Sequence, residues 1–423
     1  MKAVPVPVAG ARLVVQQLIS GVTVLEFMRD RLELVGPGQA LPAPPDVVLA
    51  PIKKGYLDFS EPEFDLGSTL KKRIRSGRAI LVIDCAREGV VHDKNRSKPL
   101  HRYLTRHRLP PEHCVYITQD RSYRAAYEEF CRERGWTPVK VLTHDYFIRL
   151  LFSKAGRTGG EVYKARLDAF RQRSARRDKR FVCLNFSPRW NKVLLLLQLM
   201  EEGLWDQGYI SFGGFSRRGV RHVQRDKMRR QLVAAQGFED IAPALADAHL
   251  EQLDAYGQVL LGHVPLSMGA RGFPKTPYLD YGMPEHDRSW FTIVTETEIE
   301  GPRRVTEKPF KALLGFHPFI LFGNAGSLSL IRELGFQTFS GFIDERYDDE
   351  PDPRRRFEMV MAEIRRLCSL DELELRRMER ELKPVLAHNA LWGLTRLPAI
   401  WREQKDPAFL DELLARPQRT AAA

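Results

Sequence analysis

The stretch from Phe291 to Gly323 constrains the fold more than any other part of the sequence. It begins with FTIVT, an alternating segment rich in β-branched residues that predicts a half-buried strand. A polar turn with Gly301 and Pro302 follows, and a helical segment opens near Thr306, with Pro309 tolerated in its first turn. HPFILFG then predicts a second, buried strand. This order predicts a βαβ unit, which places a ligand at the carboxyl ends of its strands.

The loop between these two predicted strands carries a dense cluster of charged residues. Its members are Glu296, Glu298, Arg303, Arg304, Glu307 and Lys308. A Thr-Glu-Lys tripeptide alone is common and is simply the acidic first turn of a helix. Its place between two apolar strands and after GPRR favours a functional interpretation. Glu296 can equally be a strand-end residue that pairs with Arg303.

A second buried strand is predicted near the start of the chain. AILVID is a continuous apolar run between Gly77 and Asp84, which is typical of a strand buried on both faces of a parallel sheet. Asp84 and Glu88 follow its carboxyl end, where an open α/β sheet carries its functional groups. Alternating helical and strand patterns continue from there and predict a doubly wound domain.

A third strand and helix are predicted in FVCLNFSPRWNKVLLLLQLMEEGL. The loop between them brings Arg189 and Lys192 close to the amino terminus of an apolar helix. Cations at a helix amino terminus form an anion site, and a solvated helix start is the equally weighted alternative. A further short strand is expected in GYISFGG.

The length and the pattern predict the domain organisation. A chain of 423 residues is too long for one compact core. We therefore expect an α/β protein with two doubly wound, Rossmann-like domains that face a cleft, followed by C-terminal helices. The expected boundaries are 1–165 for the first domain, 180–385 for the second, and 386–423 for the helices and tail.

Composition narrows the class of partner. The formal charge of +12 suits nucleic acid, an anionic membrane surface or a phosphorylated small molecule. Solvated arginine-rich faces explain most of it, because no RNP signature, helix-turn-helix spacing or zinc finger accompanies the basic runs, so no nucleic acid is expected. The five cysteines show no CxxC spacing, which fits a reducing compartment.

The location of the chain follows from its apolar segments. No apolar run approaches the roughly 20 residues needed to span a bilayer, so we expect a cytoplasmic protein. LWGLTRLPAIWREQ combines Trp392, Trp401 and basic residues, which fits a helix at the inner face of the membrane. Packing against the rest of the protein is the favoured alternative for this segment.

The run FTIVTETEIEGPRRVTEKPFKALLGFHPFILFG resembles the donor-binding motif of the α1,3-fucosyltransferases and of related bacterial and phage glycosyltransferases with the GT-B fold. The resemblance implies that Glu307 accepts hydrogen bonds from the donor ribose. It implies that Lys308 neutralises the diphosphate, helped by Lys192 and by Arg303 or Arg304. The family has arginine where this chain has Lys192, which makes the phosphate contact less bidentate.

The resemblance also implies a reaction. Such enzymes invert the anomeric carbon in one displacement, which requires a carboxylate to take the acceptor proton. Glu88 is the first candidate for this base and Asp84 the second. Fixed cations replace a metal ion, so neither a metal nor another cofactor is expected. The expected substrates are a nucleotide-sugar and a glycan or bacterial surface polysaccharide.

Two alternatives remain open. The donor can be a CMP-linked acidic sugar, because sialyl- and Kdo-transferases also contain an His-Pro dipeptide, although the flanks of His317 do not match theirs and a structural role is favoured. The chain can also be a basic nucleic-acid-binding or scaffold protein without catalysis. GNAGS (323–327) resembles a phosphate cradle but lacks the GxGxxG spacing, so a turn with Ser327 as helix cap is expected.

Overall fold

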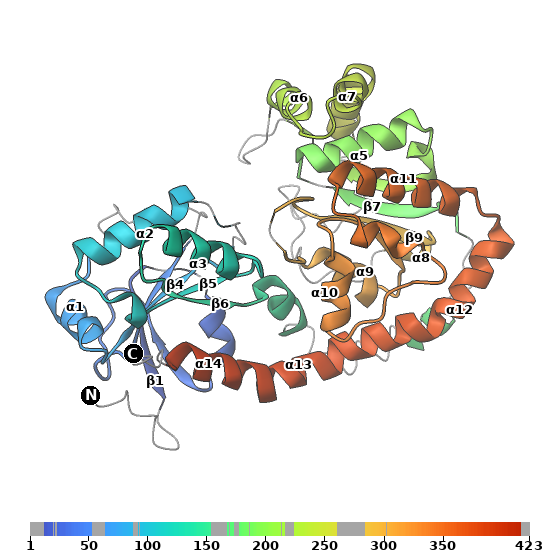
Figure 1. Cartoon of the computed structure of the whole chain (residues 1–423). Helices are drawn as coiled ribbons and strands as arrows, with labels where there is room; N and C mark the ends of the chain where they lie inside the picture. The colour runs from blue at the N-terminus through green and yellow to red at the C-terminus, as the bar shows by residue number, and fades with distance from the viewer. Residues whose placement is uncertain are drawn as a thin grey trace. The chain divides into compact units, whose positions relative to one another are not determined.

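The chain forms two compact units, each built on one parallel sheet (Figure 1). Unit 1 comprises residues 1–149, 302–304 and 399–423, and unit 2 comprises residues 150–301 and 305–398. The computed structural model describes residues 12–19, 21, 23–52, 64–87, 92, 94–153, 167–168, 170–172, 177–185, 187–212, 214–215, 224–259, 284–301 and 303–415. The predicted α/β class with parallel sheets is confirmed.

The sheet of unit 1 has six parallel strands in the order β2-β1-β3-β4-β5-β6. The strands are β1 (Leu13–Gln17), β2 (Leu32–Val35), β3 (Val47–Pro51), β4 (Ile80–Asp84), β5 (Cys114–Thr118) and β6 (Lys140–Thr143). Every residue of β3, β4 and β5 is buried, which confirms the strand predicted in AILVID. Both faces of these central strands are therefore covered, as in other parallel sheets.

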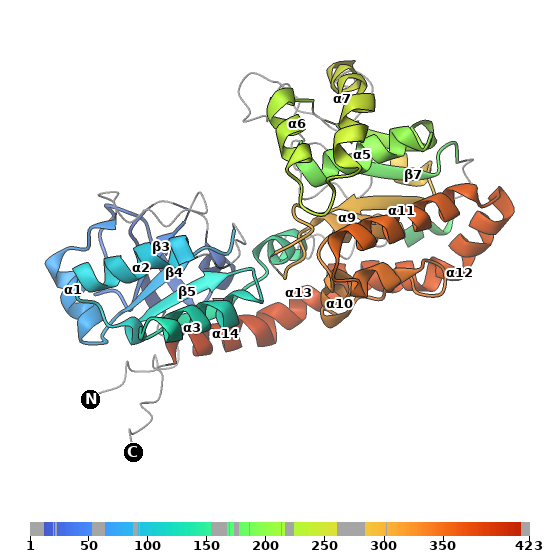
Figure 2. The same cartoon turned by 45° about the horizontal axis from the view of Figure 1, so that its top comes forward.

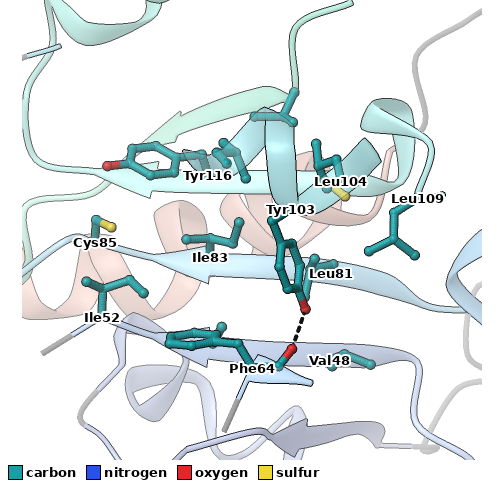
Figure 3. Close-up of a cluster of buried hydrophobic side chains, with 14 of the residues drawn as sticks. Val48, Ile52, Phe64, Leu81, Ile83, Cys85, Tyr103, Leu104, Leu109 and Tyr116 are labelled. Atoms are coloured by element: carbon teal, nitrogen blue, oxygen red, sulfur yellow. Dashed lines mark hydrogen bonds between the residues drawn. The ribbon is translucent and has the colours of Figure 1, made fainter. Parts of the chain in front are cut away.

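Three helices cover one face of this sheet: α1 (Ser68–Arg75), α2 (Lys94–Arg106) and α3 (Tyr123–Glu133). Figure 3 shows the apolar cluster beneath them, in which Leu81 of β4 lies beside the Tyr103 ring of α2, and Ile83 and Leu104 belong to the same cluster. The Tyr103 hydroxyl crosses the cluster and donates to the carbonyl oxygen of Phe64 at 2.7 Å. Its one polar atom is thus satisfied inside an apolar layer.

The end of the described chain returns to unit 1 as a helical run of η8 (Trp401–Lys405) and α14 (Asp406–Leu414). The Arg149 guanidinium donates to Asp406 at 2.5 Å, and both side chains are almost fully buried. The same guanidinium lies 5.3 Å from the ring of Trp401. Trp401 is itself buried. This tryptophan therefore packs on the protein, the alternative favoured above a membrane contact.

The sheet of unit 2 has four parallel strands in the order β10-β9-β7-β8. They are β7 (Phe181–Asn185), β8 (Gly208–Phe212), β9 (Phe291–Thr295) and β10 (Phe319–Phe322). The strand order reverses between β7 and β9, because β8 lies on one side of β7 and the later strands lie on the other. FTIVT, expected to be half-buried, is buried throughout as β9, because it is a central strand between β7 and β10 and helices cover both faces of this sheet (Figure 1).

Helices cover both faces of the second sheet (Figures 1 and 2). Right-handed crossovers in opposite directions place α5 (Trp190–Glu201) and α9 (Lys308–Leu314) on opposite faces. The α5 helix packs against α7 (Ala242–Val259), which also contacts α6 (Arg225–Val233). Further helices in the described part of the chain are α8 (Pro284–Asp287), α10 (Ser327–Glu333), α11 (Pro353–Ser369), α12 (Glu372–Leu391), η7 (Trp392–Arg396) and α13 (Leu397–Ile400). This arrangement leaves the carboxyl ends of β7 and β9 at the point where the order reverses.

The boundaries of the units differ from the predicted domain boundaries, and unit 1 ends its first segment at residue 149 instead of 165. The expected boundary at residue 386 falls inside α12, which continues to Leu391 because its apolar residues pack on unit 2 without interruption. Residues 302–304 group with unit 1 although they lie within the sequence of the second domain. The backbone N–H of Arg303 donates to Asp120 at 2.9 Å, and its carbonyl oxygen accepts from the Arg121 N–H at 3.2 Å.

Candidate functional site

The candidate site lies in unit 2, outside the carboxyl ends of β7 and β9. In open parallel sheets ligands bind where the strand order reverses, because the helices diverge to opposite faces there. Asn185 ends β7 and Glu296 directly follows β9. Both side chains are buried, so the polar groups at this edge need partners within the protein or from a ligand.

Glu296 organises the loop before α9. Its carboxylate accepts from the Thr306 backbone N–H at 2.9 Å and from the Thr306 hydroxyl at 2.6 Å. A glycine follows β10 at this point, and a Cβ on Gly323 would lie only 3.1 Å from Cγ of Glu296. The glycine therefore provides the space that the buried carboxylate occupies. Glu296 fixes the segment that begins the Thr-Glu-Lys tripeptide.

Lys308 is held by three oxygen atoms of this loop. Its ammonium group lies 2.8 Å from the Thr306 hydroxyl, 3.2 Å from the Thr297 hydroxyl and 3.5 Å from the Glu296 carboxylate. The side chain is 23% exposed, so the cation remains accessible. Charge-assisted hydrogen bonds to fixed oxygens orient the ammonium group and reduce the entropy lost when an anion binds.

Lys192 is a second cation in the same cluster, in the first turn of α5. It is 5% exposed, and among the described residues it makes neither a hydrogen bond nor an ion pair. Burial, together with nearby Lys308 and Arg189, lowers the pKa of Lys192 to about 7, against the opposing effect of Glu296 and Glu307. A buried ammonium without a partner is costly, so an anionic ligand at this position would relieve it.

The amino terminus of α5 adds further positive potential. Arg189 is its N-cap residue and makes no side-chain cap hydrogen bond. The Arg189 guanidinium lies 3.8 Å from Glu298 at a half-exposed position. Asn191 anchors this turn by donating to the carbonyl oxygen of Glu296 at 3.1 Å. First-turn N–H groups beside two cations have the geometry that favours an anion at a helix amino terminus.

Glu307 is the acidic member of the cluster. It occupies the N-cap position of α9 without making a side-chain cap hydrogen bond. Burial would raise the pKa of its carboxyl, but Lys308, Lys311 and Lys192 outweigh it and lower that pKa. The carboxylate therefore stays ionised and can accept hydrogen bonds from hydroxyl groups of a ligand.

Four of the predicted site residues are thus brought together in unit 2: Glu296, Glu307, Lys308 and Lys192, with Arg189 close to Glu298. The described hydrogen bonds of Arg303 instead join it to Asp120 and Arg121 of unit 1. Arg304 is buried. The phosphate roles of these two arginines stay predictions.

Asp84, the second candidate for the base, is the last residue of β4 in unit 1. Asp84 is buried, and its oxygens accept from the Thr23 hydroxyl at 2.5 Å, the Val24 N–H at 2.8 Å and the Ala86 N–H at 3.0 Å. Burial raises the pKa of Asp84 despite these donors. The arrangement favours a structural role for this carboxylate. Glu88, the first candidate, lies outside the described residues.

Sequence reasoning missed Arg356, which fixes both loops that border the site. This 2% exposed side chain donates to the carbonyl oxygens of Ile299 at 2.6 Å, Gly323 at 2.9 Å and Pro351 at 3.2 Å. Burial lowers the pKa of Arg356, and nearby carboxylates oppose that effect. Nothing in the RRR run of the sequence distinguishes it from Arg354 and Arg355, which are less buried.

Asn185 was also not singled out as a site residue, although its position after a buried strand was a usable signal. Its amide donates to the Thr295 hydroxyl at 3.3 Å, which joins the ends of β7 and β9. Its side-chain oxygen is buried and has no hydrogen-bond partner among the described residues. A donor on a ligand would satisfy that oxygen.

The GNAGS loop does not form a phosphate cradle. Gly326 adopts a left-handed conformation as the N-cap of α10, so the expected cap Ser327 is instead the first helical residue, where its hydroxyl donates to Asn324. The Asp348 carboxylate accepts from the N–H groups of Leu328 and Ser329 at 2.9 and 3.2 Å. The protein's own carboxylate therefore occupies the anion position at this helix.

His317 has a structural role, as favoured. It is fully buried, with Nδ1 at 2.6 Å from the Thr292 hydroxyl and Nε2 at 3.0 Å from the carbonyl oxygen of Ser289. Within the described parts of the chain, no group of three or more His, Cys, Asp or Glu residues could hold a metal ion. No helix there is long and apolar enough to cross a bilayer.

Comparison of the chain with models of protein families, with curated proteins and with solved structures finds no match.

Proposed function

We propose that the chain is a glycosyltransferase of the GT-B type that binds a nucleotide-sugar donor in unit 2. The observation that carries this proposal is the group of cations at the amino terminus of α5, where Lys308 and Arg189 act on the buried Lys192. Its position where the strand order reverses is the usual site for nucleotide ligands in open α/β sheets. A nucleotide diphosphate supplies the anion that the buried Lys192 lacks.

The proposed roles follow from charge and burial. Lys308 and Lys192 bind the diphosphate, and the ionised Glu307 accepts hydrogen bonds from the ribose hydroxyls. When the glycosidic bond to the donor phosphate breaks, negative charge develops on the leaving phosphate. Cations already held in place stabilise that charge without reorganisation in the transition state.

Transfer also requires a base that takes the acceptor proton. We propose Glu88 for this role, because the oxygens of Asp84 already accept three hydrogen bonds. The acceptor is a hydroxyl of a glycan or polysaccharide, and the product inverts at the anomeric carbon. GDP-linked donors are favoured by the motif in residues 291–323, and a CMP-linked acidic sugar is the competing donor class.

Titration calorimetry with GDP, UDP and CMP tests the proposal. We expect one of these nucleotides to bind and Lys308→Ala to weaken its affinity about 30-fold, equivalent to about 2 kcal/mol, because a charge-assisted contact is lost. Lys227→Ala on α6 is the matched control, since it removes an exposed lysine from the same unit. If no nucleotide binds, or if both variants bind equally, the proposal is wrong.

A further inference from the structure

A second basic site lies in unit 1, between the C-terminal half of α2 and the loop after α3. The cavity has a volume of about 700 Å³. We call it the α2 pocket, and the residues used below are Lys98, His101, Arg102, Arg106, Arg134 and Trp136. None of the described residues that line it is acidic. Its size is within the range of small-molecule sites, roughly 300–1,000 Å³.

The cations of α2 are not balanced by acids on the same helix. Its sequence, KNRSKPLHRYLTR, contains neither Asp nor Glu. By contrast, Arg376 and Arg377 of α12 donate to Glu372 and Glu381, four residues away on the same helix. In the described residues, Lys98, Arg102 and Arg106 form no ion pair. The cations of α2 therefore differ from those of α12, which are neutralised by acidic residues on their own helix.

The helix dipole explains only one of these charges. Arg106 lies in the last turn of α2, where the free carbonyl groups favour a cation. Lys98 and Arg102 precede it by eight and four residues, so the three side chains form a row on one face. Successive members are separated by about 6 Å along the helix axis. The row can therefore contact more than one anionic group at once.

The floor of the α2 pocket is aromatic and uncharged. The rings of His101 and Trp136 lie 4.4 Å apart, and His101 Nε2 lies 2.8 Å from the Tyr127 hydroxyl. Burial lowers the pKa of His101, which keeps the imidazole neutral. The Arg134 guanidinium lies 5.5 Å from the Trp136 ring, which leaves its N–H groups for a ligand. The α2 pocket is therefore lined by cations together with the aromatic rings of His101 and Trp136.

We infer that the α2 pocket binds a ligand with two or more phosphoryl groups, which contact Lys98, Arg102, Arg106 and Arg134 while its carbon skeleton packs on Trp136. Guanidinium groups suit this chemistry because they form bidentate hydrogen bonds with phosphate oxygens. The concave shape favours a discrete phosphorylated molecule or headgroup over a flat anionic surface. This inference does not depend on the function proposed for unit 2.

The experiment titrates the full chain with inorganic tripolyphosphate and orthophosphate in a Lys308→Ala background, which weakens the anion cluster of unit 2. We expect tripolyphosphate to bind more tightly than orthophosphate. The double substitution Arg102→Gln and Arg106→Gln should lower its affinity about tenfold or more, since two charge-assisted contacts are lost. Arg376→Gln with Arg377→Gln is the control, because it removes the same charge from α12 and should leave the affinity unchanged.

Thermal unfolding checks that the substituted proteins fold.

Vesicles of phosphatidylcholine with a bisphosphorylated inositol lipid then distinguish a lipid headgroup from a soluble compound as the source of the phosphoryl groups. If the vesicles compete with tripolyphosphate for the α2 pocket, the ligand is a lipid headgroup. If they do not compete, the ligand is a soluble phosphate compound. Equal loss of affinity in both double variants, or no binding of tripolyphosphate, overturns the inference. Tighter binding of a single-stranded oligonucleotide at equal phosphate concentration also overturns it, in favour of a nucleic-acid strand.

Discussion

Two buried carboxylates at strand ends, Asp84 in unit 1 and Glu296 in unit 2, use the same hydrogen-bonding arrangement. Each accepts from a threonine hydroxyl, at 2.5 Å from Thr23 and 2.6 Å from Thr306. Each also accepts from a backbone N–H, at 2.8 Å from Val24 and 2.9 Å from Thr306. In both units the carboxylate thereby fixes a segment elsewhere in the sequence, at Thr23 in unit 1 and at Thr306 in unit 2.

The difference lies in an additional cation. Each carboxylate also accepts from a nearby backbone N–H, Asp84 from Ala86 at 3.0 Å and Glu296 from Thr297 at 3.3 Å, but only Glu296 lies close to an ammonium group, that of Lys308 at 3.5 Å. Neutral backbone donors close a local turn in unit 1. In unit 2 the same arrangement positions a cation beside Lys192. A buried strand-end carboxylate is therefore not a functional signal by itself, and the group that it positions decides its role.

Alanine at the two carboxylates gives the largest effects. We expect Asp84→Ala and Glu296→Ala each to reduce the free energy of unfolding by about 3 kcal/mol, because each leaves buried donors without an acceptor. Only Glu296→Ala should also abolish nucleotide binding, since Lys308 loses its fixed position. Thermal unfolding and calorimetry measure the two quantities. If the Glu296→Ala protein binds the nucleotide with unchanged affinity, Glu296 has only a structural role, like that of Asp84.

Only part of the fold and of the candidate site could be predicted from the sequence. The strands were predictable because buried parallel strands are continuous apolar runs, and Glu296 and Lys308 were predictable from their place between two of them. The role of Asp84 was not, because its partner Thr23 lies 61 residues away and no local pattern records that contact. Arg356 was missed because it stands beside Arg354, which pairs with Asp240 on the surface.

The pH dependence of nucleotide affinity tests the cation side of the comparison. Burial, with Lys308 and Arg189, lowers the pKa of Lys192 to about 7, while an unfolded lysine titrates near 10.4. A bound phosphate retains the proton, so affinity should fall as the pH rises above 7, by up to about tenfold per unit. Calorimetry between about pH 6 and pH 9 in two buffers counts the protons taken up.

Two controls accompany this measurement. Lys192→Arg stays charged at every pH and should flatten the profile. Lys192→Met should be more stable than the parent at pH 7. The reason is that between about pH 7 and pH 10 the unfolded parent binds more protons than the folded one, so its stability rises with pH over that window. A sloping profile that persists in Lys192→Arg would assign the titration to another group.

The two threonines give the smallest and most specific test. Thr23→Val and Thr306→Val each remove one hydroxyl donor from a buried carboxylate, at a cost of about 1 kcal/mol in unfolding free energy. Thr306 also holds the Lys308 ammonium group at 2.8 Å, whereas Thr23 has no such role among its described hydrogen bonds. We therefore expect Thr306→Val to weaken nucleotide binding several-fold and Thr23→Val to leave it unchanged. Equal effects of the two substitutions on binding would mean that the threonines act only through stability.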